Sequence, residues 1–336
     1  MSQPSPNPAA IFDLMNSFHK TAGIRAAIEL DLFTLVNEGA STADELAARA
    51  GAASRGIRIL CDYLVVNGVM TKEDSRYRLT AESAIFLDRR SPACIGSMVK
   101  FLYSDTLRQG FAGLSDAVRN GGTVLSEQGT MDAEHPVWVE FARSMASLAL
   151  PAALGIAEIL SRDSRPVRRA LDLAAGHGLF GIKLAERNPE AEVTALDWAA
   201  VLEVAKGNAA AAGISARYHT QAGSAFDAHL GENWDVVLVT NFFHHFSLKT
   251  CQGLAERIHR SLAPGGRMVT LEFVPDNGRV SPPLPAQFAL IMLATTAEGD
   301  AYTFDEYAGI FRKVGFSSIE KHQLEMSPQQ VIVSGK

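Results

Sequence analysis

The stretch LDLAAGHG at residues 171–178 constrains this chain more than any other part of its sequence. Its apolar start is typical of a buried β-strand, and the small residues that follow would let a ligand approach the backbone closely. The helix expected after Gly178 would present unpaired N–H groups at its positive end. Strand, turn and helix therefore indicate a nucleoside-binding site, although such turns also occur where a helix only packs closely on a sheet.

Asp197 closes the next apolar segment, residues 193–196. An acidic side chain at the end of this strand suits the hydroxyl groups of a ribose. The turn contains only two glycines, Gly176 and Gly178, and no GxxxxGKS/T motif is present to hold a triphosphate. A nicotinamide or flavin dinucleotide is therefore not the best fit for this site.

Strands and helices alternate through the C-terminal half of the chain. This order predicts the α/β class, with a doubly wound, mostly parallel sheet covered on both faces. Ligands of such sheets bind beyond the carboxyl ends of the strands. Residues 223–226, residues 240–246 and Glu272 all follow or close predicted strands. We expect these three segments to converge on one cleft.

The N-terminal part, residues 11–87, has a mostly helical pattern in which apolar residues recur at spacings of three and four. Ser41 or Thr42 can cap a helix that Asp44 or Glu45 completes. A second helix and a polar hairpin between two short strands follow. Helix, turn, helix and hairpin, in this order, are typical of a winged-helix module.

A winged helix raises the possibility of DNA binding, and the charges of this one argue against it. The would-be recognition helix carries Arg55 and Arg58, with Asp62 on the same side, and the hairpin adds Glu73 and Asp74. DNA phosphates would require a basic face. The first helices are more apolar than one domain face needs, so we expect them to pair with a second subunit.

Composition excludes several other classes. With 336 residues, of which 47% are hydrophobic, the chain is long enough for two domains with cores of their own. Its formal charge of −6 argues against a nucleic-acid partner. Cys61, Cys94 and Cys251 lack metal-ligand spacing, so we expect neither a disulfide framework nor a metal site. No signal peptide or membrane-spanning stretch is apparent, which favours a cytoplasmic protein without membrane contact.

The motifs named so far resemble those of S-adenosylmethionine-dependent small-molecule O-methyltransferases of the caffeate and acetylserotonin O-methyltransferase type. LDLAAGHG matches the glycine-rich motif of that family, and the segment from Ala26 to Phe86 resembles its N-terminal dimerisation domain. The resemblance implies a class I methyltransferase fold, a Rossmann-like doubly wound sheet with an N-terminal all-helical winged-helix dimerisation domain. The implied organisation is a disordered leader (1–10), a dimerisation domain (11–90), a helical connector lining the acceptor pocket (91–165) and a catalytic domain (166–336).

The same resemblance implies S-adenosyl-L-methionine as cofactor, with S-adenosyl-L-homocysteine as product. Asp197 would hold the ribose hydroxyls and Trp198 would lie against the adenine. Ser224 and Thr240 depart from the family pattern, which often has aspartate and lysine there, but their hydroxyls can still donate or accept hydrogen bonds. The implied cofactor-binding residues are Asp172, Ala174, Gly176, Gly178, Asp197, Trp198, Ser224, Ala225, Phe226, Thr240 and Asn241.

His244 matches the catalytic histidine of the family and is the expected general base, since a histidine titrates near neutral pH. By resemblance Glu272 would orient it, and His245, which stands where the family usually has aspartate, would take the other side of the turn. The two adjacent histidines could exchange these roles. A second acidic residue of the family would fall near Ala301, and Glu298 and Asp300 are offset from it. The implied acceptor wall comprises Phe141, Met145, Phe243, Phe288 and Met292.

The sequence thus predicts an enzyme that methylates a hydroxyl group of a small, largely aromatic acceptor, acting as a homodimer. Methylation at carbon or nitrogen would use the same cofactor site. Some relatives of this fold bind the sulfonium without transferring its methyl group, which is a further alternative within the enzyme class. An alternative of another class is a winged-helix regulator with a degenerate sensor domain.

Overall fold

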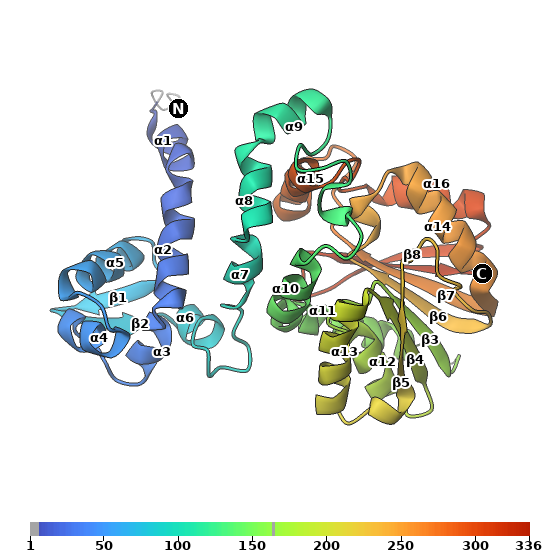
Figure 1. The fold of residues 1–336 in the computed structure, drawn as a ribbon, viewed down its shortest axis with the longest axis horizontal. Coiled ribbons are helices and arrows are strands. Elements are labelled where there is room, and N and C mark those ends of the chain that lie inside the picture. The colour runs from blue at the N-terminus through green and yellow to red at the C-terminus, as the bar shows by residue number, and fades with distance from the viewer. Residues whose placement is uncertain (1–6, 163–164) are drawn as a thin grey trace, which may run out of the picture. The chain divides into compact units, whose positions relative to one another are not determined.

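The computed structural model describes residues 7–162 and 165–336, and the chain divides into two units, Met1–Val99 and Lys100–Lys336 (Figure 1). The predicted leader, residues 1–10, lies largely outside the described residues, and its last two residues already belong to a helix. Residues 100–162 group with the sheet that follows them, whereas residues 91–99 group with the N-terminal unit. The boundary therefore falls inside the predicted connector.

The first unit has the predicted winged-helix order. Thr42 caps a helix in a capping box with Glu45, and Gly51 ends that helix in the left-handed conformation with φ of 63°. The predicted hairpin is present, so the unit is helical with one two-stranded antiparallel sheet rather than all-helical. Its elements are α1 (Ala9–Met15), α2 (Ser17–Glu29), α3 (Leu32–Asn37), α4 (Ala43–Ala50), α5 (Ser54–Val66), β1 (Met70–Glu73), β2 (Arg76–Leu79) and α6 (Ala81–Phe86).

Apolar side chains of the first two helices remain exposed within this unit. The side chains concerned are Ile11, Phe12, Leu14, Met15 and Phe18, between 62% and 73% exposed. On the would-be recognition helix, Asp62 forms ion pairs with Arg58 (3.1 Å) and Lys72 (2.6 Å). The first unit therefore has an uncovered apolar surface, and two cations on or near its would-be recognition helix are paired with a carboxylate.

The second unit is built on a seven-stranded sheet. Its strand order is β5-β4-β3-β6-β7-β9-β8; β5 to β7 are parallel, and β9 and β8 are antiparallel to their neighbours. β8 and β9 form an antiparallel hairpin at one edge of the sheet. The strands are β3 (Arg169–Leu173), β4 (Glu192–Asp197), β5 (Tyr218–Ala222), β6 (Trp234–Thr240), β7 (Leu262–Glu272), β8 (Ser318–Gln323) and β9 (Gln330–Gly335).

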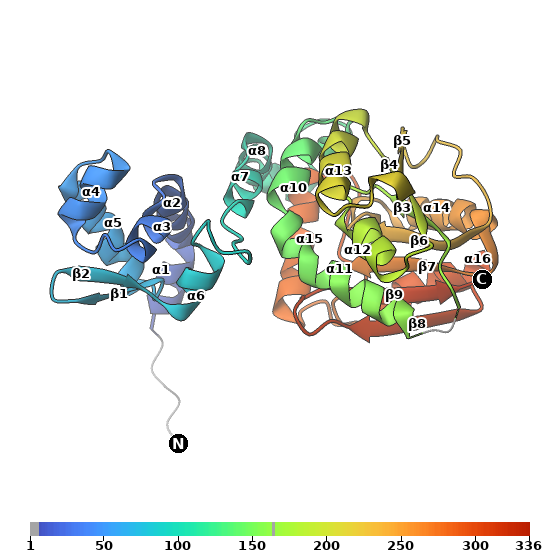
Figure 2. The same ribbon diagram turned by 90° about the horizontal axis from the view of Figure 1, so that it is seen from below.

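Helices cover both faces of this sheet, as Figure 2 shows from below. One apolar core lies under α11, α12 and α13, and the other under α14 and α16. The helical elements are α7 (Met98–Leu102), α8 (Asp105–Ala112), α9 (Leu114–Asn120), η1 (Gly129–Met131), α10 (Val137–Ser144), α11 (Ala146–Ser161), α12 (Leu179–Arg187), α13 (Ala199–Ala211), η2 (Ser215–Arg217), η3 (Phe243–His245), α14 (Leu248–Ser261), α15 (Pro283–Thr295) and α16 (Phe304–Val314).

The order in which the strands are added to the sheet reverses between β3 and β6, which places the carboxyl ends of these parallel strands around a crevice. This is where ligands of doubly wound sheets bind. Within residues 7–162 and 165–336 no single helix is long and apolar enough to cross a membrane; α10 and α11, bent by 68°, meet the length and composition criteria only as a pair.

Candidate active site

The turn after β3 has the backbone conformation that its small residues allow. Ala174, Gly176 and Gly178 all have positive φ, of 55°, 56° and 75°. A Cβ added to Gly176 would have only Phe141 within 4 Å, at 3.9 Å, so this glycine borders open space. A Cβ added to Gly178 would instead collide with the Tyr218 hydroxyl. Gly178 therefore allows the helix to pack closely, and Gly176 leaves room for a ligand beside the backbone.

Asp197 joins the turn to the end of β4. Its Oδ2 accepts a hydrogen bond from the Gly176 N–H (2.8 Å), and its Oδ1 accepts one from the Trp198 N–H (2.7 Å). Burial raises the pKa of the Asp197 carboxyl to about 6, although these two backbone donors oppose the rise. A carboxylate has about four acceptor sites, so Asp197 can accept further hydrogen bonds from a ligand.

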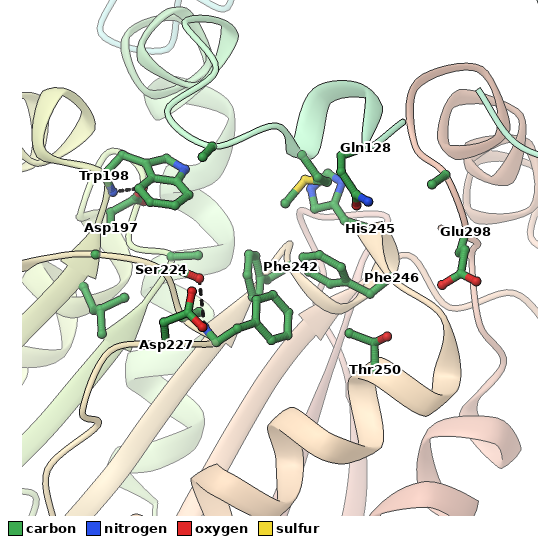
Figure 3. Close-up of a pocket in the computed structure, with 18 residues that line it drawn as sticks. Gln128, Asp197, Trp198, Ser224, Asp227, Phe242, His245, Phe246, Thr250 and Glu298 are labelled. Carbon is green, nitrogen blue, oxygen red and sulfur yellow. Dashed lines mark hydrogen bonds between the residues drawn. The ribbon is translucent and has the colours of Figure 1, made fainter. Parts of the chain in front are cut away.

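Two neighbouring cavities open at this edge of the sheet. The larger has a volume of about 400 Å³ and is drawn in Figure 3, where Asp197 and Trp198 lie at one end and Glu298 at the other. The smaller has a volume of about 70 Å³ and reaches the glycine-rich turn. The residues that line both cavities are Met131, Ala174, Asp197, Trp198, Phe242 and His245.

Most of the residues proposed from the sequence for a cofactor border these cavities. Ser224, Ala225 and Phe226 line the larger one, and Gly176, Thr240 and Asn241 line the smaller one. The structure differs from the prediction at Asp172 and Gly178, which line neither. Asp172 is fully buried and accepts a hydrogen bond from the Gly181 N–H (3.0 Å), and burial raises its pKa to about 8.

His244 and Glu272 form a buried pair, and neither residue lines the cavities. The two residues come from η3 and from the end of β7, and His244 Nδ1 is hydrogen-bonded to Glu272 Oε2. The other carboxylate oxygen accepts from the N–H groups of Phe242 (3.1 Å) and Phe243 (2.9 Å). Because the carboxylate can only accept, we assign the proton to Nδ1, which leaves Nε2 as the basic atom.

His245 rather than His244 borders the two cavities. Burial, with the neighbouring His244, lowers the pKa of His245 well below 6.5, so its ring is neutral at pH 7. A neutral ring without a carboxylate partner is a weaker proton acceptor than one paired with Glu272. The pairing therefore favours His244 as the base, and the position at the cavity favours His245 as a ligand contact.

The expected aromatic wall is only partly at the cavities. Phe141 lines the smaller cavity, whereas Met145 lines neither. Phe243 is fully buried against Tyr307 and Phe311, so the expectation that it faces an acceptor is wrong. Phe288 packs edge-on against the His244 ring at 4.8 Å, and Met292 on the same helix is 3% exposed. Neither of these two side chains lines the cavities.

Several lining residues escaped the sequence analysis. Thr250 follows a strand end that the sequence had singled out, so proximity along the chain could have indicated it. Asp227 comes three residues after Ser224 and could have been found in the same way. Others lie in segments without a periodic pattern, and no local signal pointed to them: Gln128, Met131, Ala133 and Ala297.

The loop after α15 supports the histidine turn from behind. The Asp300 N–H donates a hydrogen bond to the His244 carbonyl oxygen (2.9 Å). A Cβ on Gly299 would overlap that same oxygen and would approach the His245 carbonyl carbon to 3.0 Å. The absence of a side chain at Gly299 therefore allows this loop to lie against the backbone of the two histidines.

Gly299→Ala is expected to lower the free energy of unfolding by about 1–3 kcal/mol, because the new methyl group would push against backbone rather than against a flexible side chain. Urea unfolding measures this change. Gly253→Ala on α14 is the matched control, since nothing lies within 4 Å of its added Cβ and alanine favours a helix by about 1 kcal/mol. Equal effects at both positions would contradict the close approach at Gly299.

Within the described parts of the chain, no group of three or more His, Cys, Asp and Glu side chains is placed to hold a metal ion. The cavities border the nucleoside-type turn, an acidic side chain, several aromatic rings and a histidine. This set can bind a nucleoside and an aromatic molecule side by side.

Comparison with protein families gives two matches along the chain. The model of the O-methyltransferase domain matches residues 112–317, and that of the O-methyltransferase dimerisation domain matches residues 12–89. The tetracenomycin polyketide synthesis 8-O-methyl transferase of Streptomyces glaucescens is 28% identical over 315 residues, which cover 93% of this chain and 92% of that protein. The 3-hydroxy-5-methyl-1-naphthoate 3-O-methyltransferase of Streptomyces sahachiroi is 27% identical over 334 residues, covering 98% and 95%.

Solved structures share the whole architecture. A crystal structure of a Nostoc punctiforme protein, assigned as an O-methyltransferase, superposes with a TM-score of 0.96 at 45% identity and covers 99% of this chain and 100% of that one. Human N-acetylserotonin methyltransferase, solved in complex with S-adenosylmethionine, gives a TM-score of 0.84 at 23% identity, covering 100% and 99%. At that identity the second likeness concerns the fold alone.

Proposed function

The chain belongs to the O-methyltransferase family, and from this premise we propose that it transfers a methyl group from S-adenosylmethionine to a hydroxyl group of a small aromatic acceptor. The observation that carries the proposal is that the His244–Glu272 pair lies at the same edge of the sheet as Asp197 and the glycine-rich turn, where the parallel strands end. His244 can take a proton, and Asp197 with the glycine-rich turn can hold a nucleoside. These are the two tasks of this reaction.

The residues around the turn fit the donor. Asp197 keeps acceptor sites for the two ribose hydroxyls, Trp198 offers an aromatic surface to the adenine, and Gly176 leaves the backbone accessible. Asp197 is also held by two backbone donors, so little ordering remains to be done when a ligand binds. The donor supplies a methyl group on a sulfonium centre, already activated for displacement.

The protein's chemical task is then to prepare the acceptor hydroxyl. A phenol is mostly protonated at neutral pH, and a base within hydrogen-bond reach raises the reactive fraction. Glu272 fixes the Nδ1 proton of His244, so Nε2 is free to take the hydroxyl proton. The Glu272 carboxylate also stabilises the imidazolium that results. Positioning of both substrates supplies the remainder of the catalysis.

The charges around the cavities favour a neutral acceptor. The charged side chains that line them are the carboxylates of Asp197, Asp227 and Glu298, without a lysine or arginine among the described lining residues. Helix α15, beside His244, has no charged residue. A carboxylate on the acceptor would lose hydration there without gaining an opposite charge.

Methyl 6-hydroxy-2-naphthoate is therefore expected to react with a kcat/KM at least about tenfold higher than the free acid at pH 7, because like charges are costly when brought together. Initial rates of S-adenosylhomocysteine formation measure both. Glu298→Gln should reduce the ratio between the kcat/KM values of the ester and the free acid. Equal rates for acid and ester would contradict the assigned charge preference.

The alternatives receive no support from the comparisons. Both curated relatives named above are oxygen methyltransferases by name, and nothing favours methylation at carbon or nitrogen, or chemistry without methyl transfer. The N-terminal module, considered for a regulator, matches a dimerisation domain. We extend the proposal to a homodimer formed through the exposed apolar side chains of α1 and α2; a cytoplasmic location and the predicted domain roles remain predictions.

Calorimetric titration of S-adenosylmethionine and S-adenosylhomocysteine into the purified protein tests the proposal. Micromolar binding of both is expected, and an acceptor screen with detection of S-adenosylhomocysteine would follow. Absence of binding to the intact protein would refute the proposed function and leave the glycine-rich turn with a packing role alone.

A further inference from the structure

Strand β9 begins at the edge of the sheet where the parallel strands end. It runs antiparallel to β7, and its first residue, Gln330, pairs with Glu272, the last residue of β7. The residue before it, Gln329, is only 9% exposed and lines neither cavity. A buried polar side chain from the end of the chain therefore lies near the site, and it can influence a ligand there only through another residue.

That other residue is Asn241, to which the side-chain amide of Gln329 is hydrogen-bonded. Asn241 follows the end of β6, and its N–H donates to the Leu271 carbonyl oxygen on β7 (2.9 Å). Its backbone is left-handed, with φ of 55°, a conformation that asparagine adopts more readily than most residues. Partners distant in the sequence therefore fix both the backbone and the side chain of Asn241.

The hydrogen bond with Gln329 determines which way the Asn241 amide points. Gln329 Nε2 donates to Asn241 Oδ1, so the carbonyl side of the amide is occupied. Asn241 Nδ2 has no hydrogen bond to a residue of the described chain, and it is not one of the fully enclosed polar atoms without a partner. Asn241 itself lines the smaller cavity. The side chain therefore offers this cavity a hydrogen-bond donor.

The position of the smaller cavity relates this donor to one part of S-adenosylmethionine. Asp197 and Trp198, on the nucleoside side, line both cavities, whereas Asn241 lines only the smaller one. Beyond the ribose the molecule continues through its sulfonium centre into an amino-acid tail. An ammonium group only donates and the sulfonium accepts nothing, so the carboxylate is the group of the tail that an N–H can bind. No lysine or arginine is among the described residues that line the smaller cavity, so a neutral donor has to serve.

We propose that Gln329 is a positioning residue for the methyl donor: by binding Asn241 Oδ1 it directs Asn241 Nδ2 to the smaller cavity, where Nδ2 donates to the carboxylate of the tail. The proposal rests on the proposed function, which supplies the ligand. An amide that could turn over would present its oxygen to the carboxylate part of the time, and two acceptors repel. Fixing the amide before the ligand binds removes that cost.

Gln329→Glu tests the assignment, because a carboxylate only accepts and would turn the Asn241 amide over, with Nδ2 towards the new side chain and Oδ1 towards the cavity. Calorimetry compares S-adenosylhomocysteine with 5′-methylthioadenosine, which has the same nucleoside and sulfur but lacks the amino-acid tail. The wild-type protein should favour S-adenosylhomocysteine by at least about tenfold, and the variant should reduce this ratio at least about tenfold, since hydrogen bonds to charged groups are the strong ones.

Two further variants separate the amide from charge and from folding. Gln329→Met removes the hydrogen bond without adding a charge and should reduce the ratio by a smaller factor. Gln323→Glu adds the same charge on β8, where Gln323 pairs with Gln330, and should leave the ratio unchanged. In turnover, Gln329→Glu should raise KM for S-adenosylmethionine and leave kcat nearly unchanged, because the tail is bound alike in the ground state and the transition state.

An unchanged ratio in Gln329→Glu overturns the proposal, and so does an equal fall in Gln323→Glu, which would make charge alone the cause. If Gln329→Glu binds neither ligand, Gln329→Met decides, and a wild-type ratio in that variant overturns the proposal. A wild-type protein that binds the two ligands equally also overturns it. A wild-type protein that binds neither would instead refute the proposed function itself.

Discussion

Replacing His244 with alanine is expected to lower kcat by about 10²–10⁴-fold, the range in which a positioned general base contributes. The loss should fall mainly on kcat, because a general base acts in the transition state and contributes little to binding of the ground state. Initial rates at saturating acceptor and donor measure it. Binding of S-adenosylhomocysteine to the variant should remain, which separates a lost base from a lost fold.

Glu272→Gln examines the same pair from its other member. The glutamine oxygen can still accept from the Phe242 and Phe243 N–H groups, but its amide N–H would face His244 Nδ1. The histidine would then carry its proton on Nε2, where it cannot accept the hydroxyl proton. We expect kcat to fall about 10–100-fold. A larger loss in His245→Ala than in His244→Ala would reverse the assignment and make His245 the base.

Asp197→Asn is expected to weaken binding of S-adenosylhomocysteine by about a hundredfold or more, because hydrogen bonds to a charged group are the strong ones and two ribose hydroxyls depend on it. The substitution keeps the size of the side chain. Its amide nitrogen would also oppose one of the two backbone donors that hold the carboxylate. Calorimetry measures the loss, and Ser224→Ala, which lines the same cavity, is the control with a smaller expected effect.

The pKa of Asp197 predicts how the binding of S-adenosylhomocysteine depends on pH. Burial raises the pKa of Asp197 to about 6 from its ordinary value near 4, so the group gains a proton as the pH falls through 6. The neutral acid accepts fewer hydrogen bonds than the carboxylate. Affinity for S-adenosylhomocysteine should therefore be constant above about pH 7 and fall towards tenfold per pH unit below about pH 6. Asp197→Asn should remove this dependence, and a pH-independent wild type would contradict the assigned role.

In the N-terminal unit, local sequence patterns were sufficient to predict most of the secondary structure. The capping box at Thr42 and Glu45, the left-handed Gly51 and the hairpin after α5 are all set by residues close together in the chain. Local hydrogen bonds and turn conformations need no distant partner, so the sequence indicates them directly. The exposed apolar side chains of the first two helices follow from the same periodicity.

The residues of the candidate active site could be predicted from the sequence only in part. Asp197 and Glu272 were predictable because each ends an apolar strand, and the carboxyl ends of parallel strands meet at one edge. Which of two adjacent histidines faces the cavity was not. Glu272 on β7 is hydrogen-bonded to His244, and Trp138 on α10 packs edge-on against His245. Both partners lie far away in the sequence.

The sequence by itself determined the alternation of strands and helices, the glycine-rich turn and the acidic and basic side chains at the strand ends. Those features depend on period, size and charge, which single segments possess. Only the tertiary structure decided that Phe243 belongs to the core and that Gly299 packs against the backbone of the two histidines. It also decided that Met131 and Glu298 border the cavity. These outcomes depend on which distant loops and helices fill the space beside the sheet, and packing between remote segments leaves no local pattern to read.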